Sequence, residues 1–233
     1  MPDIRRTFHH QLDEVARDIV RLAAMTTEAI PRGTDVLLAG DLRAADELIV
    51  GDDALDALSL DIEERCYQLL ALQQPMARDL RAIVTAIRLV SEIERSADLV
   101  VNIAKGARRM YGAELSPVIR GYVERMAEQA QRLFRHALDA YAEGDDSLAA
   151  ALDDMDDDLD QVHADFIQAI FRCHAEGAVD LPCAVQLALI GRYYERIGDH
   201  AVNIGERVRY MVTGWLPEHA GAAREAVRVE EAG

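Results

Sequence analysis

Two short series of polar residues recur in the sequence at intervals of four. Each series reads Glu-x-x-x-Asp-x-x-x-Asn, and the members are Glu94, Asp98 and Asn102 in the first series and Glu195, Asp199 and Asn203 in the second. Residues four apart lie on one face of a helix. Each series therefore predicts a helix that carries two carboxylates and an amide along one face.

An acidic pair precedes each series. These Asp-x-x-x-Asp pairs are Asp52 with Asp56 and Asp153 with Asp157. A helical hairpin that turns at Pro75 would place the first pair opposite the first series, because Asp52 and Asp98 are each 23 residues from that proline. A turn near Glu176 would do the same for the second pair. We therefore expect two clusters of four carboxylates each.

Clustered carboxylates need a counter-charge, because like charges at close range raise each other's pKa and oppose ionisation. Hard metal ions take oxygen ligands, so a single ion or a multinuclear cluster held between the helices is one interpretation. Ion pairs with Arg95 and Arg196 are another, although each arginine directly follows its glutamate and points about 100° away around the helix. A solvated acidic face is the third. The metal interpretation places the ligands at Asp52, Asp56, Glu94, Asp98, Asp153, Asp157, Glu195 and Asp199.

The histidines offer little further chemistry. Asp160-x-x-His163 is half of a di-metal motif, but a ferritin-like oxidase carries a Glu-x-x-His motif on each of two helices, and the sequence has none. His200 lies beside Asp199 and is a candidate accessory ligand. The sequence has no nucleophile–base arrangement, glycine-rich phosphate loop or CxxC zinc site. We therefore expect that the protein is not an enzyme.

The spacing of apolar residues predicts helices and no strands. Phe8, Leu12 and Val15 begin a helical pattern that continues to residue 25. Pro31 and Gly33 are expected to interrupt this first helix. The six predicted helices cover Arg6–Ala29, Ala44–Leu72, Arg78–Tyr111, Ile119–Ala142, Ser147–Ala175 and Pro182–Val212.

The two halves of the chain are repeats. Glu94–Ile103 matches Glu195–Ile204 at six of ten positions with an offset of 101 residues, and the same offset relates the two Asp pairs. The sequence therefore predicts an all-α fold of two tandem three-helix bundles related by internal duplication. The expected divisions are a first repeat at 1–113, a second repeat at 114–213 and a C-terminal tail at 214–233.

Composition limits the class of partner. The chain has 233 residues, half of them apolar, and a formal charge of −17, which disfavours binding to nucleic acid and to anionic lipid and favours cations and basic partner surfaces. The longest uncharged apolar stretch, Leu181–Ile190, is too short to span a bilayer, and no signal peptide is evident. Cys66, Cys173 and Cys183 form no CxxC pair and are expected to be reduced core thiols of a cytoplasmic protein.

The segment Glu195–Ile204 resembles the signature of the PhoU family, regulators of the phosphate-specific ABC transporter. Ala71–Arg81 resembles the junction between the second and third helices of that family, and the resemblance covers residues 5–213. It implies a cytoplasmic and often homodimeric protein that negatively regulates phosphate uptake and phosphate-starvation signalling. The implied partners are the transporter's ATPase subunit, of the PstB type, and a sensor histidine kinase of the PhoR type. Membrane association would then occur only through those partners.

Some members of the family bind iron, zinc, manganese or magnesium at paired Glu/Asp-x-x-x-Asp motifs, which map onto the eight carboxylates named above. The supporting motif residues would be Arg95, Asn102, Arg196, Asn203 and His200. The first motif departs from the family pattern, because Ser96–Leu99 stands where Ile-Gly-Asp-His is usual. The resemblance thus implies a non-catalytic, metal-binding regulator, and a metal-free helical scaffold is the alternative.

Overall fold

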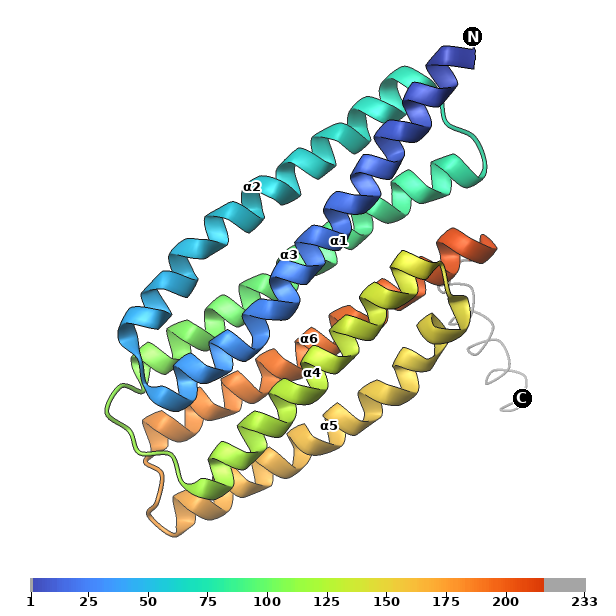
Figure 1. Cartoon of the computed structure of the whole chain (residues 1–233). Coiled ribbons are helices and arrows are strands. Elements are labelled where there is room, and N and C mark those ends of the chain that lie inside the picture. Colours follow the sequence, from blue (N-terminus) through green and yellow to red (C-terminus); the bar gives the residue numbers. More distant parts are fainter. Residues whose placement is uncertain (1, 216–233) are drawn as a thin grey trace, which may run out of the picture.

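The computed structural model describes residues 2–215, with side chains from residue 5 onward. Within that range the regular structure is entirely helical and contains no strand (Figure 1). The six helices are α1 (Pro2–Ala39), α2 (Leu42–Gln73), α3 (Arg78–Arg109), α4 (Pro117–Glu143), α5 (Asp146–Ala175) and α6 (Leu181–Thr213). The predicted all-α class is confirmed.

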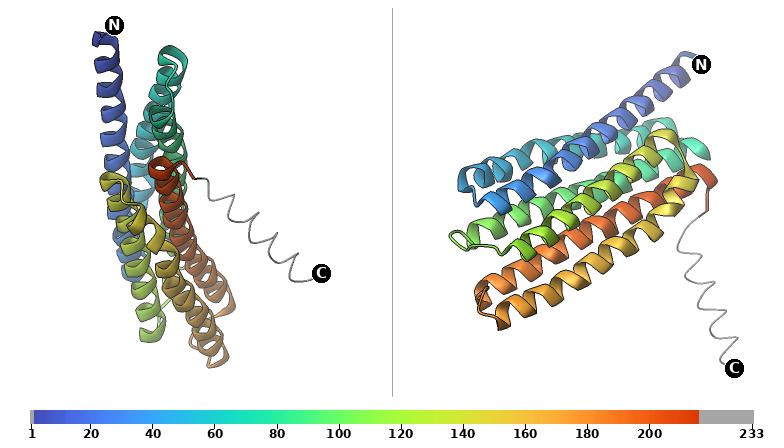
Figure 2. Two further views of the ribbon diagram at one scale, coloured as in Figure 1. Left: turned by 90° about the vertical axis from the view of Figure 1, so that its right-hand side faces the viewer. Right: turned by 60° about the horizontal axis from the view of Figure 1, so that its bottom comes forward.

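The helices form two three-helix bundles that lie side by side (Figures 1 and 2). Helices α1 to α3 make the first bundle and α4 to α6 the second, and the contacts of α3 with α6 and of α1 with α4 join them. Helices α3 and α6 run antiparallel: Thr85 Oγ1 donates to the carbonyl of Arg207 (3.4 Å), whereas Gly106, further along α3, packs against Ile190. The predicted pair of tandem bundles is therefore confirmed.

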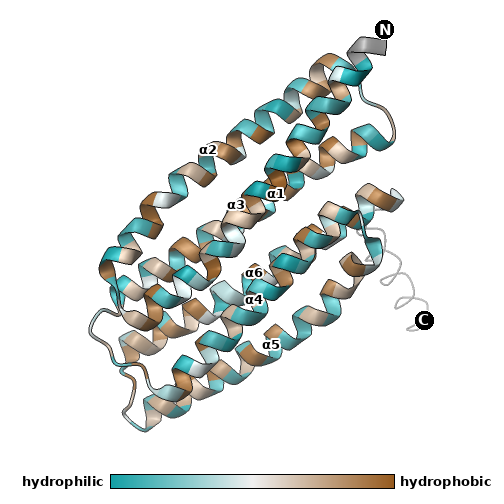
Figure 3. Ribbon diagram, viewed as in Figure 1, coloured by the Kyte–Doolittle hydropathy of each residue, from teal (hydrophilic) through white to brown (hydrophobic). Residues whose placement is uncertain are grey.

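Each helix turns an apolar stripe inward, and the alternation of hydrophobic and hydrophilic residues along the ribbons is visible in Figure 3. On α4 the residues Ile119, Val123, Met126 and Leu133 follow the helical spacing and are fully buried. Full burial of such a side chain contributes about 1.5–3 kcal/mol relative to exposure. This burial is the main force that holds the bundles together.

Side-chain caps set four of the helix starts. In each case a side-chain oxygen accepts a hydrogen bond from a backbone N–H of the first turn, which would otherwise lack a partner. The capping residues are Asp41, Ser116, Asp145 and Asp180. These starts lie within two residues of the predicted ones.

The expected interruption of the first helix at Pro31 is wrong, because α1 continues through Pro31 and Gly33 to Ala39. A proline inside a helix leaves the carbonyl four residues earlier without its N–H donor. That carbonyl belongs to Thr27, and it accepts a hydrogen bond from Gln131 Nε2 of α4 at 3.2 Å. The second bundle thus replaces the bond that the proline removes.

The turn around Pro75 lies where the sequence predicts it. Helix α2 ends at Gln73 and α3 begins at Arg78. Gln74 and Ala77 in this turn have positive φ angles of 45° and 49°. Gln74 is in the left-handed helical conformation, and together the two residues reverse the chain within a few positions. The tight reversal fixes the level at which α2 and α3 face each other.

No helix in residues 2–215 is long and apolar enough to cross a membrane. Cys66, Cys173 and Cys183 are buried and free, as predicted. The predicted C-terminal tail comprises residues 214–233, and its residues 216–233 lie outside the part of the chain that the structure describes.

Candidate functional site

The first carboxylate cluster forms at the facing surfaces of α2 and α3. Burial, followed by the charges of Asp56 and Asp98, raises the pKa of Asp52 to about 6. Burial and the charges of Asp56 and Asp98 likewise raise the pKa of Glu94. Asp52 and Glu94 are half-buried, whereas Asp56 and Asp98 are exposed. The α2–α3 hairpin therefore brings Asp56 and Asp98 within electrostatic reach of both Asp52 and Glu94.

Few basic groups offset this first cluster. Lys105 lowers the pKa of Asp52 and Arg95 lowers that of Glu94, but in both cases the raising effects are larger. Arg95 is exposed, and it forms an ion pair with Glu92, at 3.9 Å, on the preceding turn of its own helix. The predicted alternative of a buried Arg95–Glu94 pair is therefore wrong.

The second cluster lies between α5 and α6 and has a different composition. Glu195 is buried and Asp199 is half-buried on α6, whereas Asp153 and Asp157 of α5 are exposed. The carboxylate that α5 turns toward α6 is Asp156, whose Oδ1 lies against Gly198.

Asp156 also has a strongly raised pKa in the second cluster. Burial and the charges of Asp160, Asp199, Asp153 and Asp157 raise its pKa to about 7. The second cluster therefore gathers the predicted residues together with Asp156 and Asp160, which the motif comparison did not select.

An arginine is built into the second cluster, although it is not the predicted one. Arg192 pairs with Glu195 Oε1, and its other terminal nitrogen lies 4.0 Å from Asp199 Oδ2. Arg192 precedes Glu195 by three residues and so shares its helix face. Arg196 is exposed instead, which agrees with its expected direction about 100° away from Glu195 and does not support the alternative interpretation of an Arg196 ion pair. The first cluster has Ser91 at the position equivalent to Arg192.

His200 and Asn203 link the two bundles and do not enter the second cluster. His200 Nδ1 lies 2.6 Å from Glu92 Oε2, and Asn203 Nδ2 donates to the same oxygen at 3.2 Å. Burial opposes ionisation of Glu92, but these two hydrogen bonds and the charges of His200 and Arg95 together outweigh it and lower the pKa of Glu92. Asn102 is half-buried on α3. The signature residues of α6 thus hold α3 and α6 together.

Comparing the two repeats position by position points to the residues that the motif search missed. The capping residues Asp41 and Asp145, and the buried positions of α2 and α5, align at an offset of 104 residues. Asp156 and Asp160 are therefore the counterparts of Asp52 and Asp56 in the first repeat. The offset of 101 residues, which relates α3 to α6, hides this correspondence in the sequence.

The donor set suits a hard cation, although the side chains do not preform a site. Within the described part of the chain, no group of three or more His, Cys, Asp or Glu side chains is arranged to hold a metal ion. Carboxylates without a cation repel one another. Asp156 Oδ1 and Glu195 Oε2 are nevertheless buried without a hydrogen-bond partner. Unsatisfied buried oxygens of this kind fit a bound cation, which side-chain rotation would have to bring within reach.

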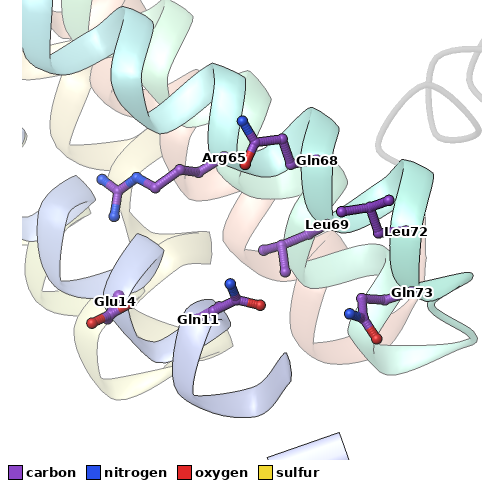
Figure 4. Close-up of a pocket in the computed structure, with 7 residues that line it drawn as sticks. All are labelled: Gln11, Glu14, Arg65, Gln68, Leu69, Leu72 and Gln73. Atoms are coloured by element: carbon purple, nitrogen blue, oxygen red, sulfur yellow. The ribbon is translucent and has the colours of Figure 1, made fainter. Parts of the chain in front are cut away.

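A small pocket of about 80 Å³ lies elsewhere, between α1 and α2. Figure 4 shows its polar lining, which includes Gln11, Glu14 and Arg65. The Arg65 guanidinium is already paired with Asp18 at 2.6 Å and Asp61 at 2.8 Å. The pocket therefore offers no unpaired guanidinium, and it contains none of the clustered carboxylates.

Comparison with known proteins assigns the chain to a family. The chain matches the family model described as PhoU domain twice, over residues 19–107 and 123–208. It is 34% identical to the phosphate-specific transport system accessory protein PhoU homolog 1 of Mycobacterium leprae, with 92% of this chain and 96% of that protein covered. A PhoU homolog of Clostridium acetobutylicum is 29% identical, with 90% and 96% covered.

Solved structures agree. The crystal structure of PhoU from Pseudomonas aeruginosa superposes with a TM-score of 0.84 at 27% identity, covering 89% of this chain and all of that one. The phosphate transport system regulatory protein PhoU from Streptococcus pneumoniae superposes with a TM-score of 0.83 at 25% identity, covering 90% and 98%. The chain therefore belongs to the PhoU family of phosphate transport accessory proteins.

Proposed function

We propose that this protein is a cytoplasmic negative regulator that couples the phosphate ABC transporter to phosphate-starvation signalling. Its partners would be the transporter's ATPase subunit and a sensor histidine kinase, and its working form a homodimer. Family membership over almost the whole chain supports a role in the phosphate transport system. The net charge of −17 favours basic partner surfaces over nucleic acid.

The second part of the proposal is that the carboxylate clusters bind divalent or trivalent cations, such as iron, zinc, manganese or magnesium. The observation that carries it is the first cluster, where burial together with the charges of Asp56 and Asp98 raises the pKa of Asp52 to about 6 and also raises that of Glu94. Asp153, Asp157, Glu195 and Asp199 would form the second group of candidate ligands. A bound cation would neutralise this charge and fix the packing of helix on helix.

A metal-free scaffold is the second candidate function. The pairing of Arg192 with Glu195 and its approach to Asp199 favour it, because they supply an internal counter-charge to one of the two clusters. Under this alternative the acids would be structural, and chelators would change neither stability nor partner binding.

Gene replacement would test the regulatory role. We expect deletion of the gene to switch on a phosphate-starvation reporter in phosphate-rich medium, and the wild-type gene to switch it off again. A variant carrying Asp98→Asn and Asp199→Asn should fold, since Asp98 is exposed and Asp199 half-buried, but should fail to restore repression. Restoration by this variant would support the scaffold, and an unchanged reporter in the deletion strain would refute the regulatory proposal.

A further inference from the structure

Apolar side chains lie exposed where the α2–α3 turn leads into α3. Met76 in the turn is 79% exposed, and Leu80 on the first turn of α3 is 40% exposed. Val84 is half-buried and follows Leu80 on the same helix face, because the two are four residues apart. Arg81 and Arg88 lie along the edge of this stripe, seven residues from each other. We call these five residues the α3 patch.

The α3 patch is basic, although the protein as a whole is acidic. The segments 78–88 and 206–215 contain five arginines and two acids, whereas the net charge of the chain is −17. Within residues 5–215, neither Arg81 nor Arg88 forms an ion pair with a carboxylate. A surface of this kind is complementary to a partner that combines apolar residues with carboxylates.

Helix α6 ends at this patch. Arg81 Nε donates a hydrogen bond to the carbonyl of Met211 at 3.4 Å, and a Cβ on Gly214 would lie 3.6 Å from Arg81 Cζ. Gly214 has a φ angle of 78°, and this left-handed conformation ends the helix and turns the chain away from the helix axis. Residue 215, the last described one, therefore lies beside the patch.

The segment that follows, residues 216–233, is long enough to cover the patch. As a helix it would span about 27 Å, and Leu80 and Arg88 are about 12 Å apart along α3. The segment contains four glutamates and two arginines, so its charge is opposite to that of the patch. The matched family domain ends at residue 208, so the segment is a feature of this chain beyond that domain.

The spacing of residues in this segment matches the α3 patch. Ala222, Ala226 and Val229 are four and three residues apart, which is the spacing of one helix face. Glu218 and Glu225 fall at the edge of that face and are seven residues apart, as the two arginines of the patch are. An apolar stripe with two glutamates at its edge is the complement of an apolar stripe with two arginines at its edge.

We propose that residues 216–233 fold back and dock onto the α3 patch of their own chain. Because the segment starts beside Arg81, it runs along α3 in the direction of Arg88. Glu218 then faces the first of these arginines and Glu225 the second, and the apolar residues of the segment cover the apolar stripe. While docked, the segment excludes other acidic partners from the patch. This docking is independent of cation binding and of any partner in phosphate transport.

Disulfide trapping in the full chain tests this docking. Val84→Cys is combined with Ala222→Cys, and the rate of intrachain disulfide formation under mild oxidation is measured by mass spectrometry. The three native cysteines are buried, so they do not compete. The matched control is Val212→Cys with Ala222→Cys, because Val212 is 41% exposed at the same end of the molecule but packs toward Gly144. We expect the Val84 pair to close about tenfold faster or more, although the control site is the more exposed one.

Charge reversal tests which residues hold the segment. Arg88→Glu should slow closure of the Val84–Ala222 pair by about two- to fivefold, the size expected for one exposed ion pair. Adding Glu225→Arg should restore the rate, since the reversed pair attracts again. Arg88 is exposed, so its variant should keep the circular dichroism melt of the parent.

The outcomes decide between docking sites. Equal closure rates of the two cysteine pairs, or closure unaffected by Arg88→Glu, would overturn the docking. A disulfide-linked dimer as the main product would place the segment on a second copy and overturn docking onto its own chain. Trypsin cleavage at Arg224 in the chain without added cysteines is an independent readout. It should be faster in the Arg88→Glu variant than in the unsubstituted protein, and equal cleavage rates would contradict the proposal.

Discussion

At the scale of single residues, the carboxylates of the two clusters shape how stability depends on pH. The raised pKa of Asp52, about 6 against an ordinary 3.8, means that the folded state holds a proton that the unfolded state has already lost. Such a group stabilises the fold fully below its unfolded pKa, and this contribution disappears as the pH rises through about 6. Asp156, with a pKa of about 7, acts in the same direction.

Asp52→Asn tests this linkage in protein freed of metal by chelation. We expect the variant to melt above wild type near neutral pH, because it removes a crowded charge, and the difference to shrink as the pH falls from about 7 to about 4. Asp53→Asn, at the exposed neighbouring position, is the control. A difference that stays constant across this range, or grows toward acid, would contradict the crowding.

Arg192 allows a second residue-scale prediction. Its removal leaves the buried carboxylate of Glu195 without a counter-charge, so Arg192→Ala should lower the free energy of unfolding by about 1–3 kcal/mol in chelator. Arg196→Ala, on the exposed side of the same helix, should change it by less than about 0.5 kcal/mol. Equal losses of unfolding free energy for the two variants, measured by urea unfolding, would contradict a specific role of Arg192 in neutralising Glu195.

At the scale of elements, the first helix shows where local rules fail. The sequence predicts a break at Pro31, and by local rules alone that prediction is sound. The compensating donor, Gln131, lies 104 residues from Thr27 along the chain and on another bundle. A rule that considers only neighbouring residues has no access to that donor.

A double-mutant cycle measures this compensation. Gln131→Ala should cost about 1–3 kcal/mol in wild type, because it leaves the Thr27 carbonyl unsatisfied. In a Pro31→Ala background the backbone N–H of residue 31 can serve that carbonyl, so the same change should cost markedly less. Identical costs in the two backgrounds, measured by urea unfolding, would show that Gln131 does not stand in for the missing bond.

Most of the architecture was predictable, because each helix carries its own signals. Apolar spacing, the capping residues and the turn at Pro75 place the helix starts within a few residues, and the offset of 101 residues identifies the duplication. The composition of the second cluster was less accessible. Asp156 is one of many acids in its segment, and only the facing Gly198 distinguishes it as the half-buried acid whose Oδ1 is turned toward α6. The role of Arg192 likewise depends on which helix face meets α5.

At the scale of the whole molecule, the signature residues connect the bundles. His200 and Asn203 of α6 converge on Glu92 of α3, whereas the sequence pattern suggested that they would support the carboxylates beside them. The first cluster includes residues of α3 and the second includes residues of α6, and these two helices also pack against each other at the junction between the bundles. A structural change at either cluster can therefore alter the packing of α3 against α6.

A cycle between Glu92→Ala and Asn203→Ala tests the junction. We expect a coupling energy of about 0.5–3 kcal/mol, because the two side chains share a hydrogen bond in a partly buried site. Asn102, the repeat counterpart of Asn203, is the control: Asn102→Ala should add to Glu92→Ala without coupling, since ten residues of helix separate them. Coupling of equal size in both cycles would rule out a specific link to α6.

The most direct test of the central claim, that cation-loaded clusters connect this protein to the phosphate transporter, is a calorimetric titration. The purified chain would be titrated into the ATPase subunit of its own organism's transporter, once with manganese present and once with chelator. We predict binding that weakens by about tenfold or more when the cation is removed. Absence of binding with manganese present, or binding of equal strength in chelator, would contradict the claim.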